Sequence, residues 1–176
     1  MRALGPGSVS SLLKVVLDVF YYVLCAVAAL AAIVVLALLL ISFDPQILPR
    51  AVLAQARVMG HPVGLVAAAN LTGALLWLIG VAAIVQRLRR IFGALTAGDP
   101  FHPANVRRLR VIALVLALVE IDTYAFAALD RFVFKTPSPE RFSLNLTAWF
   151  AVLVIVVLAE VFREGARLRR DAELTI

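Results

Sequence analysis

The sequence predicts an all-α integral membrane protein, a bundle of four transmembrane helices with short cytoplasmic helical extensions. Of the 176 residues, 63% are hydrophobic and only 16% are charged, and the mean hydropathy is +0.99. These values lie far outside the range of soluble domains. The apolar residues gather in four stretches, each close to the roughly 20 residues that a helix needs to cross a bilayer. Because the loops between them are short, we expect a single domain over residues 1–176.

The four apolar stretches cover residues 19–43, 62–86, 111–129 and 142–159. With the flanking turns, we predict helices over about 15–43, 64–87, 108–132 and 144–165. The first stretch is about twice as long as the core of a signal peptide, so we expect a permanent span. In the second, small residues recur at four-residue spacing from Gly64 to Ala68 and from Ala69 to Gly73. This spacing predicts a close contact with another helix.

The basic residues predict the orientation, because Lys and Arg beside a span are retained in the cytoplasm. With the N-terminus inside, twelve of the 17 basic residues fall on the cytoplasmic side. The other five are Arg50, Arg57, Arg131, Lys135 and Arg141. We therefore expect both termini to be cytoplasmic. The same distribution explains the net charge of +6, so it predicts contact with anionic lipid headgroups and no direct binding of nucleic acid.

The connection between the second and third spans is predicted to be a helical hairpin. Apolar residues beyond the second span keep the spacing of one helix face: Leu88, Ile91, Phe92 and Leu95. We therefore predict that this helix continues to about Thr96. Gly98 is typical of a C-terminal cap and Asp99-Pro100 of a turn, and Pro103 is typical of the first turn of the next helix.

The segment after the fourth span is also amphipathic. One stripe holds Leu158, Val161, Phe162, Gly165 and Leu168, and another holds Arg163, Arg167 and Arg170. The apolar stripes of this tail and of the hairpin have no partner other than lipid unless they meet. We therefore predict that the hairpin and the tail pack together as one cytoplasmic surface.

Two acids, Glu120 and Asp122, interrupt the third span. Glu120 lies about nine residues beyond Val111, which places it about 13 Å into the membrane. An ionised carboxylate there costs about 3 kcal/mol, so we expect Glu120 to be protonated, paired or hydrated. Asp122 lies about 200° further around the helix, and we predict that Glu120 is the acid that faces the bundle interior. Two interpretations stay open: a structural hydrogen bond, for instance to Asn70, Thr72 or a tyrosine, or a role in proton or ligand handling.

Glu160 is a third acidic candidate, at the cytoplasmic end of the fourth span, where we expect it to pair with Arg163. Cys25 is the only cysteine, which excludes disulfides within the chain. His61 and His102 fall on opposite sides of the membrane, so they cannot share a metal in one subunit. The sequence holds no Ser-His or Cys-His pair and no phosphate-binding glycine loop. We therefore expect no catalytic residues, metal site or cofactor.

Two stretches, GDPFHPANVRRLRVI and AEVFREGARLRRDAELTI, resemble the patterns of a family of small four-helix bacterial inner-membrane proteins of uncharacterised function. The motif residues are Gly98, Asp99, Pro100, Phe101, Asn105, Arg108 and Leu109, and then Phe162, Arg163, Gly165, Leu168 and Leu174. Members of that family are often encoded beside a small helix-turn-helix regulator. The resemblance therefore implies a location in the bacterial inner membrane and a link between the membrane and transcription.

These observations favour a non-enzymatic regulatory or signalling protein whose cytoplasmic hairpin and tail bind a soluble partner. The alternative is a small proton-coupled transporter or efflux subunit that uses Glu120. This alternative requires a homo-oligomer in which Glu120 lines a cavity, and it lacks the broken helices that are typical of transporters.

Overall fold

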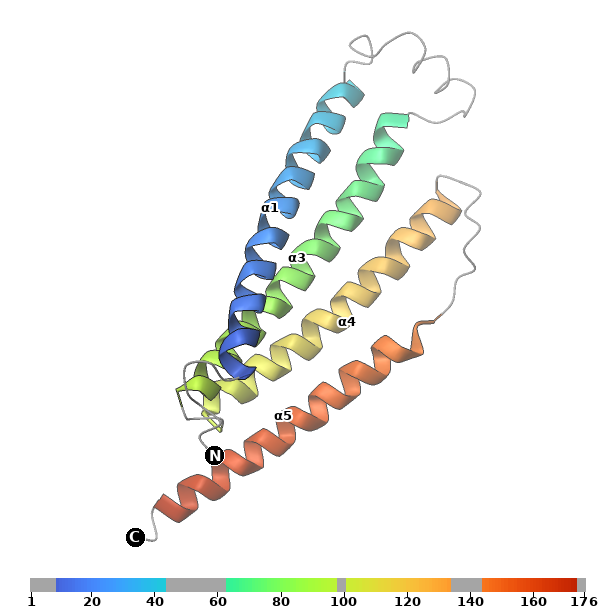
Figure 1. Cartoon of the computed structure of the whole chain (residues 1–176). Helices are drawn as coiled ribbons and strands as arrows, with labels where there is room; N and C mark the ends of the chain where they lie inside the picture. Colours follow the sequence, from blue (N-terminus) through green and yellow to red (C-terminus); the bar gives the residue numbers. More distant parts are fainter. Residues whose placement is uncertain (1–8, 44–62, 98–100, 134–143, 174–176) are drawn as a thin grey trace. The chain divides into compact units, whose positions relative to one another are not determined.

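The computed structural model describes residues 9–43, 63–97, 101–133 and 144–173. This part of the chain forms α1 (Val9–Phe43), α3 (Val63–Thr96), α4 (Pro103–Phe132) and α5 (Leu146–Glu173) (Figure 1). It contains no strand, and each of the four described helices is long and apolar enough to cross a membrane. The predicted fold class, an all-α membrane protein with four transmembrane helices, is confirmed.

The helix ends in the hairpin agree with the prediction, since α3 ends at Thr96 and α4 begins at Pro103. His102 caps α4: its Nδ1 accepts a hydrogen bond from Ala104 N at 3.1 Å, and its carbonyl accepts one from Asn105 N at 2.8 Å. The predicted cap at Gly98 and turn at Asp99-Pro100 lie outside the described residues. Both α1 and α5 extend further than predicted, because amphipathic turns continue these helices beyond their apolar stretches.

The helices contribute to two compact units. The first unit comprises Met1–Leu24, Gly80–Glu120 and Asn145–Ile176, and the second comprises Cys25–Ile79 and Ile121–Leu144.

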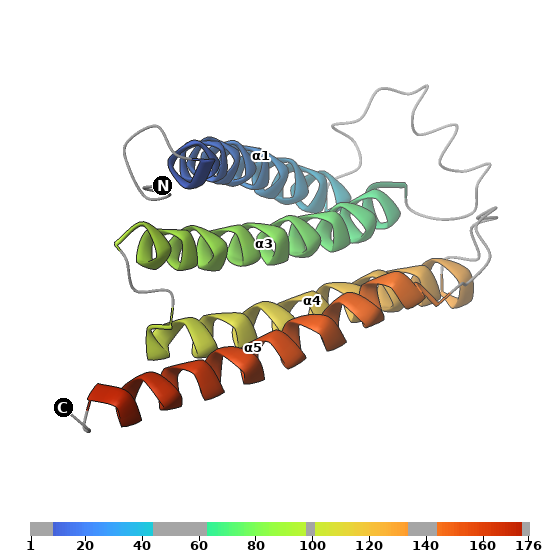
Figure 2. The same cartoon turned by 60° about the horizontal axis from the view of Figure 1, so that its bottom comes forward.

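The first unit contains an apolar core of Ile91, Leu109, Ile112 and Ala159. The side chains packed against this core are Ile84, Leu88, Leu95, Ile155 and Phe162. Three helices thus supply it, and Figure 2 shows the first half of α4 beside α5. Within the same unit, Gly80 of α3 lies directly against a methyl group of Val119, which is 7% exposed.

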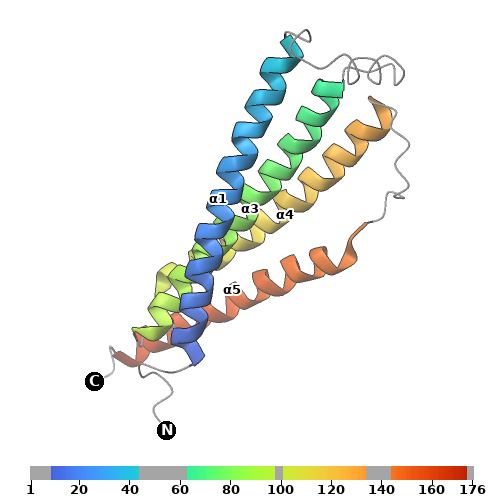
Figure 3. The same ribbon diagram turned by 45° about the horizontal axis from the view of Figure 1, so that its top comes forward.

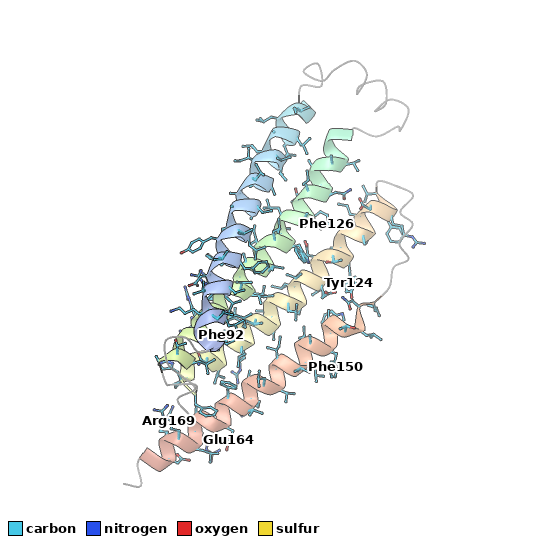
Figure 4. The ribbon with its side chains drawn as sticks, viewed as in Figure 1. Phe92, Tyr124, Phe126, Phe150, Glu164 and Arg169 are labelled. Carbon is cyan, nitrogen blue, oxygen red and sulfur yellow. The ribbon has the colours of Figure 1, made fainter. Side chains whose placement is uncertain are left out.

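In the second unit, α3 and α4 also approach through a glycine. A Cβ built on Gly73 lies 2.7 Å from the ring of Phe126, which Figure 4 shows directed from α4 towards α3. With its amide nitrogen facing Asp130, Asn70 donates to both carboxylate oxygens, at 2.9 and 3.2 Å. The close contact predicted for the small residues of the second span is therefore confirmed at Gly73. The absent side chain leaves room for an aromatic ring.

Many large apolar side chains of the described helices are exposed, above all on α1, where Leu12, Val15 and Tyr22 are each more than 60% exposed. A protein in water rarely exposes so much contiguous apolar surface. In a bilayer the same surface meets lipid chains at no cost. The exposure therefore agrees with a multi-pass membrane protein.

Candidate functional site

The described basic residues of the first unit gather at one end, built from the start of α1, the end of α3, the start of α4 and the end of α5. We call residues 14–18, 86–93, 101–110 and 160–171 the arginine-rich end. Figure 3 shows these segments together, and Figure 4 marks Glu164 and Arg169 on α5. Both stretches that carry the family resemblance contribute to this end, so distant parts of the sequence meet there.

The first contact between the two stretches is aromatic. The rings of Phe101 and Phe162 lie 5.6 Å apart between centroids, at 48°. A Cβ built on Gly165 would lie 2.7 Å from two ring atoms of Phe101. Only glycine lets the ring approach α5 this closely. We call Phe101, Phe162 and Gly165 the Phe101 joint. It confirms the predicted packing of the hairpin against the tail.

The second contact is polar and holds the two arms of the hairpin together. Arg108 Nη1 donates to Asn105 Oδ1 at 2.7 Å and to the backbone carbonyl of Arg90 at 2.9 Å. Asn105 is completely buried, and a buried amide is costly unless it is hydrogen-bonded. Asn105 and Arg108 therefore link α4 to α3.

Beside the Phe101 joint, α4 and α5 enclose an open groove of about 440 Å³. We call it the α4–α5 groove. Its lining residues are Pro103, Val106, Arg163, Glu164, Ala166, Arg167 and Arg170. Three cations and one carboxylate leave this lining with a net charge of +2. The groove thus combines an apolar wall from α4 with a basic rim from α5.

Ion pairs along α5 are exposed and weak. Glu160 pairs with Arg163, as predicted, and with Arg110 of α4 at 3.4 Å. Arg167 lies 3.8 Å from Glu164 and 3.9 Å from Asp171. Pairs of this kind contribute only tenths of a kcal/mol, so their arginines can exchange partners at little cost.

Other motif residues fall in different places. Leu109 is buried in the apolar core, but Leu168 is 62% exposed. Val161 and Leu158 of the same apolar stripe are exposed as well, so the contact of the tail with the hairpin runs through Phe162 and Gly165. Gly98, Asp99, Pro100 and Leu174 lie outside the described residues.

The two acids of the third span are both half-buried. Exposure therefore does not single out Glu120 as the interior acid. Asp122 lies three residues from Val119 and four from Phe126, and both of these contact glycines of α3. One of the two open interpretations gave these acids a structural hydrogen bond, for instance to Asn70, Thr72 or a tyrosine. Asn70 and Thr72 are engaged elsewhere, since Asn70 bonds to Asp130 and Thr72 donates to the Ala68 carbonyl.

One polar cluster of the first unit was not predicted. Asp18 of α1 forms an ion pair with Arg89 of α3, whose guanidinium carbon lies 4.6 Å from the Tyr21 ring centroid and 5.3 Å from that of Tyr22. Gln86 donates to the Tyr21 hydroxyl at 3.5 Å. The sequence does contain a signal for this cluster: Asp18 and Arg89 flank the apolar stretches of two consecutive spans, at the ends that lie on the same side of the membrane.

In the described part of the chain, no three or more His, Cys, Asp or Glu residues are grouped so that they could hold a metal ion. Comparison with curated proteins gives no significant match, and neither does comparison with solved structures. A family described as "Protein of unknown function (DUF2975)" matches residues 16–176. The match includes both motif stretches, the Phe101 joint and nearly all of the four described helices. With its two motif stretches joined at the arginine-rich end, the chain belongs to the DUF2975 family.

Proposed function

We propose that this protein is a non-enzymatic regulatory component of the bacterial inner membrane that holds a soluble partner at its arginine-rich end. The observation that supports the proposal most strongly is the α4–α5 groove. Its two walls come from the two stretches that carry the family resemblance, and the Phe101 joint holds them together. The partner's contact segment is acidic with at least one apolar side chain. The carboxylates pair with the basic rim, and the apolar group lies against Val106 and Ala166.

A preformed groove favours binding, because ordering a flexible site costs free energy. Gly165 and Phe101 fix the start of α4 against α5. Arg108, which is held by the buried Asn105, ties α4 to the Arg90 carbonyl of α3. Within the part of the chain that the structure describes, the rim arginines Arg163 and Arg167 form ion pairs with exposed acids of their own helix. A partner's carboxylates can replace these at small cost. The family resemblance makes a small helix-turn-helix regulator the first candidate partner.

The test compares the full-length protein with the charge-reversal variant Arg167→Glu/Arg170→Glu. The matched control is Arg107→Glu/Arg131→Glu, since Arg107 and Arg131 are exposed and lie outside the groove. Soluble proteins crosslinked to each variant in membranes are identified, purified and titrated against the protein in nanodiscs. We expect one partner to bind the wild type and the control alike, to bind the groove variant at least about tenfold more weakly, and to lose affinity with salt. If every captured protein binds the groove variant as tightly as the wild type, the proposal is wrong.

A second candidate is proton-coupled transport. It is favoured by the two half-buried acids of α4, for which no hydrogen bond or ion pair to another described residue is found. Proteoliposomes with an internal pH dye test it. Transport predicts a proton flux that Glu120→Gln or Asp122→Asn abolishes in a folded protein, and a wild type without flux excludes this candidate.

A further inference from the structure

A second groove lies between α1 and α3 in the first unit, on lining residues that the α4–α5 groove does not share. It has a volume of about 500 Å³ and is lined by Lys14, Asp18, Gln86, Arg89, Arg90 and Gly93. We call it the α1–α3 groove. Its walls carry three cations and one carboxylate, which leaves a net charge of +2.

The cations of this groove differ in their surroundings. Asp18 compensates the charge of Arg89, whose guanidinium also stacks on Tyr21. Neither Lys14 nor the Arg90 side chain forms an ion pair with any residue that the structure describes. Two uncompensated cations on facing helices therefore line one cavity, and such an arrangement suits an anion.

The groove also has room beside these cations. Gly93 of α3 lines it, and a Cβ built there would meet no atom within 4 Å. Because Gly93 has no side chain, the space beside Arg90 in the groove is unoccupied. A compact group with several oxygen atoms, such as a phosphate, fits the combination of space and charge.

The surface next to the groove indicates what else the ligand carries. From Lys14 towards the centre of α1, the side chains of Val15, Val19 and Val23 are 62%, 59% and 52% exposed. In a membrane-spanning helix such an apolar surface faces lipid chains. Tyr22, which is 65% exposed, marks the depth at which aromatic rings meet headgroups.

We propose that the α1–α3 groove is a specific site for one anionic phospholipid. Its phosphate lies between Lys14 and Arg90, and an acyl chain runs along the exposed valines of α1. The proposal does not depend on a soluble partner at the α4–α5 groove. The ligand is a lipid and not free phosphate because the apolar surface begins directly beside the two cations.

The test measures lipid binding to the detergent-purified full-length protein by native mass spectrometry. The added lipid is phosphatidylglycerol, with zwitterionic phosphatidylcholine for comparison. The site variant is Lys14→Gln/Arg90→Gln, and the charge-matched control is Arg107→Gln/Arg131→Gln. We expect the wild type and the control to retain one phosphatidylglycerol molecule preferentially. In the site variant we expect about 30-fold weaker binding, from two lost charge contacts near the membrane surface.

A steric variant provides an independent result without a change of charge. Gly93→Leu places a side chain in the unoccupied space of the groove, so the protein should lose the bound lipid. The protein should still fold, because leucine has a higher helix propensity than glycine. Equal lipid retention in the site variant and the control, with Gly93→Leu also binding normally, overturns the proposal. Displacement of the lipid by millimolar inorganic phosphate, or equal retention of phosphatidylcholine, also overturns it, since the first indicates a phosphate site and the second a nonspecific lipid surface.

Discussion

At the residue scale, two glycines in the arginine-rich end have opposite surroundings. A Cβ on Gly165 would approach the Phe101 ring to 2.7 Å, whereas a Cβ on Gly93 would meet nothing within 4 Å. Both glycines lie in helices, so both lower helix propensity by about 1 kcal/mol relative to alanine. Only at Gly165 does a packing contact offset that cost.

This contrast predicts opposite effects of the same substitution. Gly93→Ala should raise the thermal unfolding midpoint, because it gains helix propensity without a clash. Gly165→Ala should lower the midpoint, since it costs about 1–2 kcal/mol of unfolding free energy when the ring of Phe101 must leave α5 and Phe162. Circular dichroism in detergent measures both midpoints. In the Gly165→Ala background, Phe101→Ala should cost less than it does alone, and additive effects of the two substitutions would contradict the Phe101 joint.

At the element scale, the packing of α3 against α4 depends on bulky side chains of α4 that sit over glycines of α3. Val119 lies on Gly80 in the first unit, and Phe126 lies on Gly73 in the second. Lipid chains are as apolar as valine or phenylalanine, so association of these helices depends on close fit and not on the hydrophobic effect. A side chain at either glycine removes that fit.

We therefore predict that Gly80→Ala destabilises the protein by about 1–3 kcal/mol through overpacking against the stiff, β-branched Val119. Val119→Ala should restore much of this loss, because it removes the methyl group that the new Cβ meets. Unfolding of the two single variants and the double variant in detergent gives the coupling free energy. A coupling near zero would show that α3 and α4 do not meet at this position.

At the scale of the whole molecule, the chain is a multi-pass membrane protein with four described helices long enough to span the bilayer. Five of the 17 basic residues fall in the loops predicted to be outside, and the other twelve fall on the predicted inner side. This distribution gives the orientation prediction, with the arginine-rich end in the cytoplasm.

Cysteine labelling tests this orientation. In a Cys25→Ala background, a cysteine at Ser138 should react with an impermeant thiol reagent added to intact cells. A cysteine at Ala97, which is exposed, should react only after the cells are lysed. The reverse pattern would place both grooves outside, and neither a cytoplasmic partner nor an inner-leaflet lipid could then reach them.

The sequence by itself determined the membrane location, the all-α class and the helix ends in the hairpin. These features depend on composition, on apolar length and on local signals such as Pro103, all of which act within a few residues.

The motif residues of the arginine-rich end were also identified from sequence, through the family resemblance. Their partners were not: Phe101 against Gly165 and Arg108 against the Arg90 carbonyl join segments that are far apart in the chain. The tertiary structure likewise decided which side chains of α4 approach α3, whereas the prediction that Glu120 faces inward stays a prediction, since both acids are half-buried. In a membrane both lipid and the protein interior are apolar, so hydrophobic periodicity does not distinguish the two faces of a span. The positions of Gly73 and Gly80 do distinguish the two faces, because the bulky side chains of Phe126 and Val119 approach α3 where it has a glycine and therefore no side chain.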